Sequence, residues 1–316
     1  MKTMRLAFAA LLTPLVLAGQ TPPSAALDQE PAGRPGALLA RTAEEADAMA
    51  QNLPKTLTLE TLEQRGTLPP SRFRLRGASP SAAPPPRSPV RQVVSEYSVG
   101  PLKDTGSQNL YEFRQVVSVD GQPVQSEESA RRALSLGMQS QSDRIRKRML
   151  EEFAKHGLVD VATDYGLILL LFTRRDWNNL QVGLPAGGRI GTDAALVIAW
   201  KQLSSTGGEL EFHGRRSLHL SLEGRLWIRK SDGLPLRVEA WAEALDGSHR
   251  VRDQASVEYV MSSHGFLTPA SVLHRHSVDG QLMTENLYRY EPFRMFAADA
   301  EIKFTEVPEP AVPGKP

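Results

Sequence analysis

The chain has 316 residues, with 37 Lys and Arg against 36 Asp and Glu, and its 41% of apolar residues suffice for a hydrophobic core in one large or two medium domains. A formal net charge of +1 does not provide the strongly basic face that nucleic acids require, so no nucleic-acid partner is expected. The absence of Cys excludes disulfides, thiolate metal ligands and Cys nucleophiles.

Residues 1–19 have the pattern of a secretory signal peptide. Lys2 and Arg5 precede an apolar run at residues 6–18, and small residues follow. This 13-residue run is shorter than the ~20 residues that a membrane-spanning helix needs, so no permanent membrane anchor is predicted. Gln20 stands where a lipobox requires Cys, which excludes lipidation there. We therefore expect an exported protein, periplasmic or extracellular.

Residues 20–65 are expected to hold a helix and a strand. Thr42 and Glu45 form a capping-box pattern, which predicts that a helix begins there and runs to about Asn52. The apolar side of this helix carries Ala46, Met49 and Leu53. Alternation at residues 56–60 indicates a possible strand, with Leu57 and Leu59 as its apolar positions. The proline-rich residues 66–90 predict an extended linker.

Residues 91–306 are predicted to form the main domain. Alternating apolar residues within 93–99 and 111–119 indicate two strands, and residues 126–157 predict a charged helical insert with a break near Gly137. The wholly apolar residues 167–172 are interpreted as a central strand, and residues 193–203 as a strand or a short helix. A last strand is expected at residues 302–304, followed by a disordered tail at residues 307–316.

Asp-Gly pairs predict hairpins in the last third of the chain, because both residues tolerate the positive φ of tight turns. A three-residue loop at residues 231–233 pairs Leu226 with Val238 and Ile228 with Leu236. A two-residue loop at residues 246–247 pairs Val238 with Ala255 and Leu236 with Val257. Both registers place apolar residues on one face. The sequence therefore predicts a mainly β (α+β) fold: an open antiparallel half-barrel or meander packed over a few helices.

The two faces of this meander differ in character. The apolar face is expected to line a cavity with Leu220, Leu222, Leu226, Leu236, Val238, Ala240, Ala242, Val257, Tyr259, Val272 and Tyr288. The small side chains at residues 240–244 leave space, which a helix, the N-terminal segment or a ligand must fill. The opposite face carries Trp227 and Trp241 among Arg residues, which predicts cation–π contacts.

The stretch from Gly224 to Glu239, GRLWIRKSDGLPLRVE, resembles the strand–turn–strand pattern of the periplasmic lipoprotein-carrier (LolA/LolB-like) superfamily. Residues 263–270 and 285–290 continue the resemblance, which extends loosely over residues 90–306. It implies an unclosed antiparallel β-barrel wrapped over helices, whose concave apolar face receives acyl chains, and hence a lipid or an acylated protein as partner. The chain departs from a typical carrier in its length, its proline-rich N-terminal extension and the insert at residues 126–157.

Four polar residues are predicted to meet at one end of the apolar face. Asp253, His274, His276 and Asn286 lie on neighbouring strands near the 246–247 turn. They fit a head-group site at the mouth of the cavity, a His/His/Asp metal site, or polar residues that meet water at a hairpin end without a further task.

No catalytic motif is present: the sequence has no G-x-S-x-G, H-E-x-x-H, P-loop or G-x-G-x-x-G pattern. No enzyme activity, cofactor or bound metal is therefore expected, and the sequence predicts a secreted protein that holds a lipid or an acylated partner. One alternative is an envelope interaction or scaffold protein whose own helix fills the concavity. The other is a metal-dependent hydrolase at Asp253, His274 and His276. Ligand identity and oligomeric state do not follow from the sequence.

Overall fold

The computed structural model describes residues 35–66, 90–103, 109–159, 161, 164–204, 209–212, 216–219 and 221–296. These residues belong to one compact unit that begins at Pro35. The expected signal peptide, residues 67–89 of the linker, Leu220, the strand expected at residues 302–304 and the tail at residues 307–316 lie outside the described residues.

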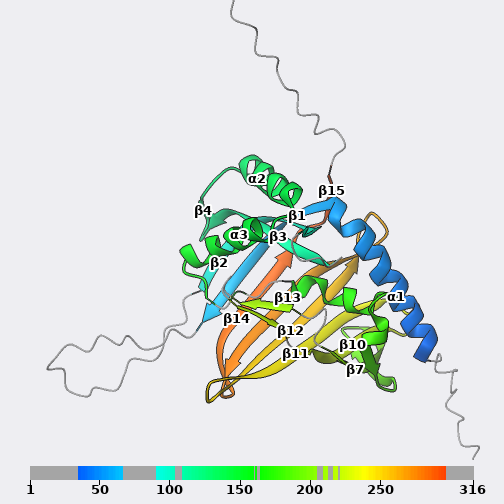
Figure 1. Cartoon of the computed structure of the whole chain (residues 1–316). Coiled ribbons are helices and arrows are strands. Elements are labelled where there is room, and N and C mark those ends of the chain that lie inside the picture. Colours follow the sequence, from blue (N-terminus) through cyan, green and yellow to red (C-terminus); the bar gives the residue numbers. More distant parts are fainter. Residues whose placement is uncertain are drawn as a thin grey trace, which may run out of the picture. The chain divides into compact units, whose positions relative to one another are not determined.

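One large antiparallel sheet dominates the unit (Figure 1). In chain order its strands are β1 (Thr56–Gly66), β2 (Val90–Pro101), β3 (Leu110–Val119), β4 (Gln122–Pro123), β5 (Leu180–Val182), β6 (Ala186–Ile190), β7 (Asp193–Gln202), β10 (Glu223–Arg229), β11 (Pro235–Asp246), β12 (His249–Met261), β13 (Leu267–Val278), β14 (Gln281–Tyr290) and β15 (Arg294–Met295). Strands β8 (Glu209–Phe212) and β9 (Arg216–His219) form a separate two-stranded sheet.

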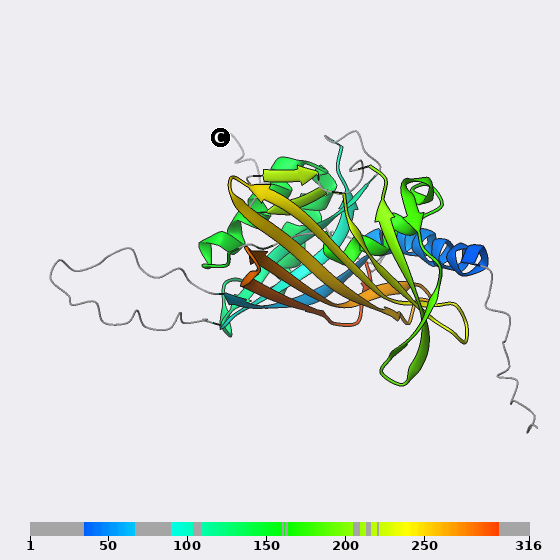
Figure 2. The ribbon, with the colours of Figure 1, turned by 90° about the horizontal axis from the view of Figure 1, so that it is seen from below.

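The strand order of the large sheet is β4-β3-β2-β1-β14-β13-β12-β11-β10-β7-β5, so within the described part of the chain the sheet stays open. The long strands β11 to β14 curve together, as Figure 2 shows. The predicted fold class, a mainly β open antiparallel half-barrel with a few helices, is confirmed. Strand β1 lies between β2 and β14, so the strand expected within residues 20–65 is a central part of the same sheet as residues 90–295.

The N-terminal helix α1 (Pro35–Asn52) ends where the sequence predicted but begins earlier. Thr42 is not a cap: it is buried within the helix, and its hydroxyl donates a hydrogen bond to the Leu38 carbonyl at 3.1 Å. Pro35 occupies the first helical position, where its fixed φ and missing N–H are tolerated. A short 3₁₀ turn, η1 (Leu53–Lys55), connects α1 to β1.

The insert at residues 126–157 consists of two helices, α2 (Glu127–Ser140) and α3 (Asp143–Lys155). The break lies at Gln141, whose φ is 51°, and not at Gly137 as predicted. Gly137 is buried within α2, and a Cβ there would lie 2.3 Å from the Met149 methyl of α3. This glycine therefore allows two helices to approach each other and does not end one. Within the described residues, none of the helices combines the length and apolar character that crossing a bilayer demands.

The prediction of a central strand at residues 167–172 is wrong. Residues Tyr165–Phe172 form a 3₁₀ helix, η2, and a second short one, η3, covers Trp177–Asn179. A short, wholly apolar run has no periodicity that separates a buried strand from a buried helix. The other uncertain segment, at residues 193–203, is a strand, β7.

The β10–β11 hairpin follows the predicted register over most of its length. Leu226 pairs with Val238, but Ile228 pairs with Pro235 and not with Leu236. The turn occupies residues 230–233, because the backbone N–H of Arg229 bonds to the carbonyl of Leu234 at 2.8 Å. A bulge at Leu236 compensates for the longer turn and restores the predicted pairs beyond it.

The β11–β12 hairpin is shifted by two residues from the predicted register. Val238 pairs with Val257 and Ala240 with Ala255, and the two-residue loop is Gly247-Ser248. Gly247 takes a φ of +63° at the first turn position, which is the position that a type II′ turn gives to glycine. A shift of two keeps every side chain on its predicted face, because strand side chains alternate with a period of two.

Candidate functional site

The concave face of the sheet carries the residues that the sequence placed around a cavity. Nine of the eleven lie in one apolar core and are 0–4% exposed. These nine are Leu222, Leu226, Val238, Ala240, Ala242, Val257, Tyr259, Val272 and Tyr288. The prediction that Leu236 lines the cavity is wrong. Leu236 is the extra residue of the bulge, is half-buried and does not belong to this core. Leu220 lies outside the described residues.

Helices of the same chain cover this face. The 3₁₀ helix η2 contacts β11, β12 and β13, and α1 in turn packs on η2 and β13. The Tyr259 hydroxyl anchors η2: it accepts a hydrogen bond from the Leu169 N–H and donates one to the Gly166 carbonyl, each at 3.1 Å. Phe172 meets Trp200 edge to face, with ring centroids 5.6 Å apart. The space above the alanines is therefore occupied by η2 and by these aromatic rings.

The outward face of β10, β11 and β12 is polar, and its tryptophans lie beneath guanidinium groups. Arg237 lies 5.8 Å from the centre of the Trp227 ring. Arg225 and Arg252 lie 5.8 and 5.6 Å from the Trp241 ring. The predicted cation–π contacts on this face are confirmed.

The four polar residues expected at the cavity mouth do come together. Both histidines share one carboxylate oxygen of Asp253, through His274 Nε2 at 3.1 Å and His276 Nδ1 at 2.9 Å. Asn286 Nδ2 contacts His274 Nδ1 at 3.1 Å. Three of the four are buried, since Asp253, His274 and Asn286 are at most 2% exposed, whereas the side chain of His276 is 15% exposed. Tyr165 of η2 stacks on His274.

The electrostatics of this cluster follow from its contacts. Burial raises the pKa of Asp253, but hydrogen bonds from His274 and His276 outweigh it, so the pKa lies below the usual range for an aspartate. Asp253 is therefore a carboxylate at neutral pH. Across the described residues, no group of three His, Asp or Glu side chains has a geometry that could hold a metal ion. The hydrolase alternative thus gains no support.

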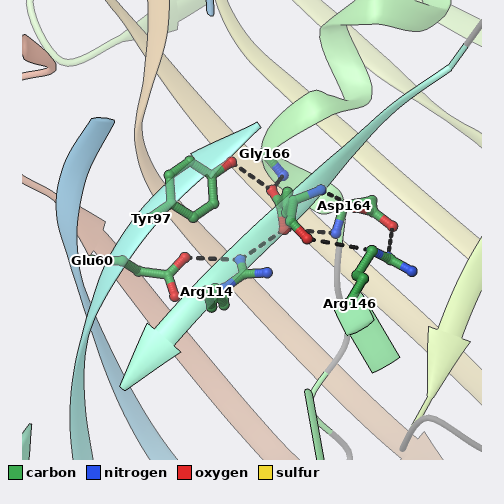
Figure 3. A network of polar contacts seen from close by, with 7 residues as sticks. Glu60, Tyr97, Arg114, Arg146, Asp164 and Gly166 are labelled. Atoms are coloured by element: carbon green, nitrogen blue, oxygen red, sulfur yellow. Dashed lines mark hydrogen bonds and ion pairs between the residues drawn. The ribbon is translucent and has the colours of Figure 1, made fainter. Parts of the chain in front are cut away.

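A second polar cluster on the concave face was not predicted from the sequence. Arg114 on β3 forms a two-pronged ion pair with Glu60 on β1, at 2.7 and 2.8 Å, and a further ion pair with Glu112 at 2.7 Å (Figure 3). The Arg114 guanidinium also lies over the rings of Tyr97 and Tyr288. All three charged side chains are at most 2% exposed.

Two carboxylates therefore share one guanidinium away from water. Burial raises the pKa of Glu60 above its usual range, Arg114 opposes this, and the charge of Glu112 adds to it. Burial lowers the pKa of Arg114, but Glu112 and Glu60 outweigh it and hold that pKa well above its usual range. Arg114 is thus permanently charged, and burial makes protonation of Glu60 easier than in water.

This second cluster fixes the beginning of η2. The Glu112 carboxylate accepts hydrogen bonds from the backbone N–H groups of Asp164 at 2.7 Å and Gly166 at 3.1 Å. Asp164 in turn accepts one from the Glu112 N–H at 2.8 Å and pairs with Arg146 of α3 at 2.6 Å. One strand, β3, is thereby connected to both α3 and η2. The arrangement orders the cover of the concave face, and no reactive nucleophile is part of it.

No family model and no curated protein sequence matches the chain. Among solved structures, the chain is similar to a LolA superfamily protein from Nitrosomonas europaea, with 10% sequence identity and a TM-score of 0.31. The superposition covers 80% of this chain and 93% of the other chain. Such a likeness concerns the course of the backbone only.

Proposed function

We propose that the protein is exported and holds a lipid, or the acyl chain of an acylated partner, on the concave face of its sheet, in a binding and not a catalytic role. One observation carries the proposal. The occupant of that face is an eight-residue 3₁₀ helix, Tyr165–Phe172, whose sequence is YGLILLLF. Runs of 3₁₀ helix beyond three or four residues are uncommon, because their hydrogen-bond geometry is poor. The segment is thus an apolar plug with little stability of its own.

An acyl chain is a suitable replacement for this plug. Hydrophobic contacts do not depend on orientation. The methylene groups of an acyl chain can therefore replace the η2 side chains against the lining at little net cost in free energy. Each buried methylene contributes ~0.8 kcal/mol. The small side chains of Ala240, Ala242 and Ala255 leave the floor of the face smooth enough for a linear chain. Glu112 holds the start of η2 through the Gly166 N–H, and Tyr259 holds its middle through the Leu169 N–H.

The test uses the mature protein purified from an exporting host and native mass spectrometry, followed by extraction and lipid mass spectrometry. We expect bound lipid on the wild type and its loss in Ala242→Trp, because an indole on the concave face occupies the acyl site. Glu243→Trp is the matched control, since the neighbouring side chain on β11 is exposed on the other face. Equal lipid occupancy in both folded variants contradicts the proposal.

The second candidate is a scaffold protein without a ligand, and a specific observation favours it. The lining residues are 0–4% exposed, and η2 and α1 of the same chain cover them. Tyr259→Phe separates the two candidates, because it removes both hydrogen bonds that the Tyr259 hydroxyl makes with η2. Increased uptake of a fluorescent fatty acid by this variant supports the carrier. A wild type without lipid together with a Tyr259→Phe variant without uptake supports the scaffold.

A further inference from the structure

Arg114 has hydrogen-bond donors that its ion pairs do not use. We call Glu60, Glu112 and Arg114 the Arg114 cluster (Figure 3). Nε and Nη2 of Arg114 donate to the two oxygens of Glu60 at 2.7 and 2.8 Å, and Nη2 also pairs with Glu112 Oε2 at 2.7 Å. A guanidinium carries five N–H groups, and two of them belong to Nη1. Nη1 is buried and has no hydrogen-bond partner among the described residues.

The guanidinium is held in place, so Nη1 cannot turn towards either carboxylate. The two-pronged pair with Glu60 fixes its orientation in the plane. The rings of Tyr97 and Tyr288 lie against it, with their centres 5.1 and 5.5 Å from Cζ. A buried donor without a partner is costly, and such donors in native proteins are explained by a bound water or ligand. The missing partner of Nη1 is therefore an oxygen acceptor.

The charge of the Arg114 cluster decides which kind of oxygen fits. Two carboxylates face one guanidinium. Even where Glu60 takes up a proton, the charge of the cluster only rises to zero, so no positive charge is left over for a carboxylate or a phosphate. An added anion would also lie close to Glu112 in a medium of low dielectric constant, where like charges repel strongly. The acceptor that fits is a neutral oxygen.

The start of η2 lies on the same cluster and adds a second requirement. A Cβ on Gly166 would lie 2.7 Å from Glu112 Oε1 and 3.4 Å from the Tyr97 hydroxyl. The backbone N–H groups of Asp164 and Gly166 donate to the Glu112 carboxylate at 2.7 and 3.1 Å. A ligand that displaces η2 takes these donors away from a buried carboxylate. Its polar group must then donate to Glu112 as well as accept from Arg114.

We infer that the Arg114 cluster binds the polar group of the lipid, and that this group is neutral and both donates and accepts hydrogen bonds, as a secondary amide or an alcohol does. The inference rests on the proposed function and specifies its class of ligand. The acyl chain would extend from this cluster over the alanines. From β1, which carries Glu60, to β12, which carries Ala255, the sheet has three strand spacings, roughly 14 Å. A long acyl chain bridges this distance.

Three probes with the same acyl chain separate the classes of polar group. N-methylhexadecanamide donates and accepts, methyl hexadecanoate has the same shape but only accepts, and hexadecanoate is an anion. Displacement of a fluorescent fatty-acid ester from the full chain at neutral pH gives the three dissociation constants. We expect the amide to bind about tenfold more tightly than the ester, because only the amide donates to the Glu112 carboxylate. Hexadecanoate should bind more weakly than the ester.

Arg114→Lys tests the contribution of Nη1. An ammonium has three N–H groups, which suffice for the bonds to Glu60 and Glu112 and leave none for a ligand. We expect the amide and the ester each to lose about tenfold in affinity, while the difference between them stays. The control is Arg289→Lys at the exposed ion pair with Glu63, which should change neither affinity.

Infrared spectroscopy gives a readout on the wild type alone, independent of how well the variant folds. The carbonyl band of an isotope-labelled amide probe should lie at lower frequency on the protein than in an apolar solvent, because a hydrogen bond from a guanidinium weakens the C=O bond. Equal affinities for the three probes, or a carbonyl band at its apolar-solvent frequency, would mean that a water alone satisfies Nη1 and would overturn the inference but not the carrier proposal. If none of the three probes binds, the carrier proposal itself fails.

Discussion

At the scale of single residues, Arg114 is a buried charge held by several partners. Its guanidinium is buried, binds Glu60 and Glu112, and lies over two tyrosine rings. A buried ion pair contributes modestly while it is complete, but removal of one member leaves the other charge in a medium that solvates it poorly. Here the removal of Arg114 would leave two carboxylates behind.

We therefore expect Arg114→Met to lower the free energy of unfolding by about 3–5 kcal/mol. Urea denaturation followed by circular dichroism at neutral pH measures this difference. The matched control is Arg289→Met, which breaks an ion pair with Glu63 at 2.7 Å on the exposed side of β14. That loss should stay below about 1 kcal/mol, because exposed ion pairs are solvated and screened. Equal losses in the two variants would show that burial adds nothing to the Arg114 pair.

At the scale of elements, η2 depends on contacts with other elements. Gly166 makes hydrogen bonds to both β3 and β12: its N–H donates to Glu112, and its carbonyl accepts from the Tyr259 hydroxyl. The backbone there approaches the sheet so closely that a Cβ would lie 2.7 Å from Glu112 Oε1. No other residue type fits at this position without a shift of the carboxylate.

Gly166→Ala should therefore destabilise the protein by about 1–3 kcal/mol, as overpacking of a core does. It should also increase hydrogen exchange in η2 more than elsewhere, since a shift of Glu112 weakens its hydrogen bonds to the backbone N–H groups of Asp164 and Gly166. Thermal unfolding and exchange mass spectrometry measure the two effects. The same substitution at Gly187 on β6 is the control, because a Cβ there has no neighbour within 4 Å. If both alanines behave alike, steric crowding at Gly166 is not the cause.

At the scale of the whole described unit, the sheet joins segments that are distant along the chain. Strand β1 pairs with β2 on one side and with β14 on the other, as in Glu60 with Tyr290. The cover of the concave face comes from α1 and η2, again from different parts of the sequence. Such long-range pairing predicts cooperative unfolding, because loss of β1 separates the two halves of the sheet.

Leu62→Ala tests this cooperativity, since Leu62 is fully buried on β1 and its truncation should cost about 2–5 kcal/mol. Trp200, Trp227 and Trp241 lie on β7, β10 and β11, in the half of the sheet remote from β1, and the fourth tryptophan, Trp177, lies in η3. We expect the urea midpoint from tryptophan fluorescence and that from circular dichroism to fall together. If the fluorescence midpoint stays at its wild-type value, β1 unfolds independently of the rest.

The sequence by itself determined the C-terminal meander. Period-two alternation and Asp-Gly turns are local signals, and they were sufficient for the strands, for the faces of the buried lining residues other than Leu236 and for the meeting of Asp253 with His274 and His276. The registers at Leu236 and at the 246–247 turn were wrong, because a bulge and the choice of turn type depend on packing between strands.

Only the tertiary structure decided what lies on the concave face. Leu57 and Leu59 looked like the inward positions of β1, but Glu60 faces inward, because Arg114 on a strand remote in sequence neutralises it there. Likewise residues 167–172 carry no periodicity, and whether they pair with a sheet or cover it depends on the space that Ala240 and Ala242 leave. Local patterns report which side chains avoid water, whereas the partner of a buried charge or of an apolar run comes from distant parts of the chain.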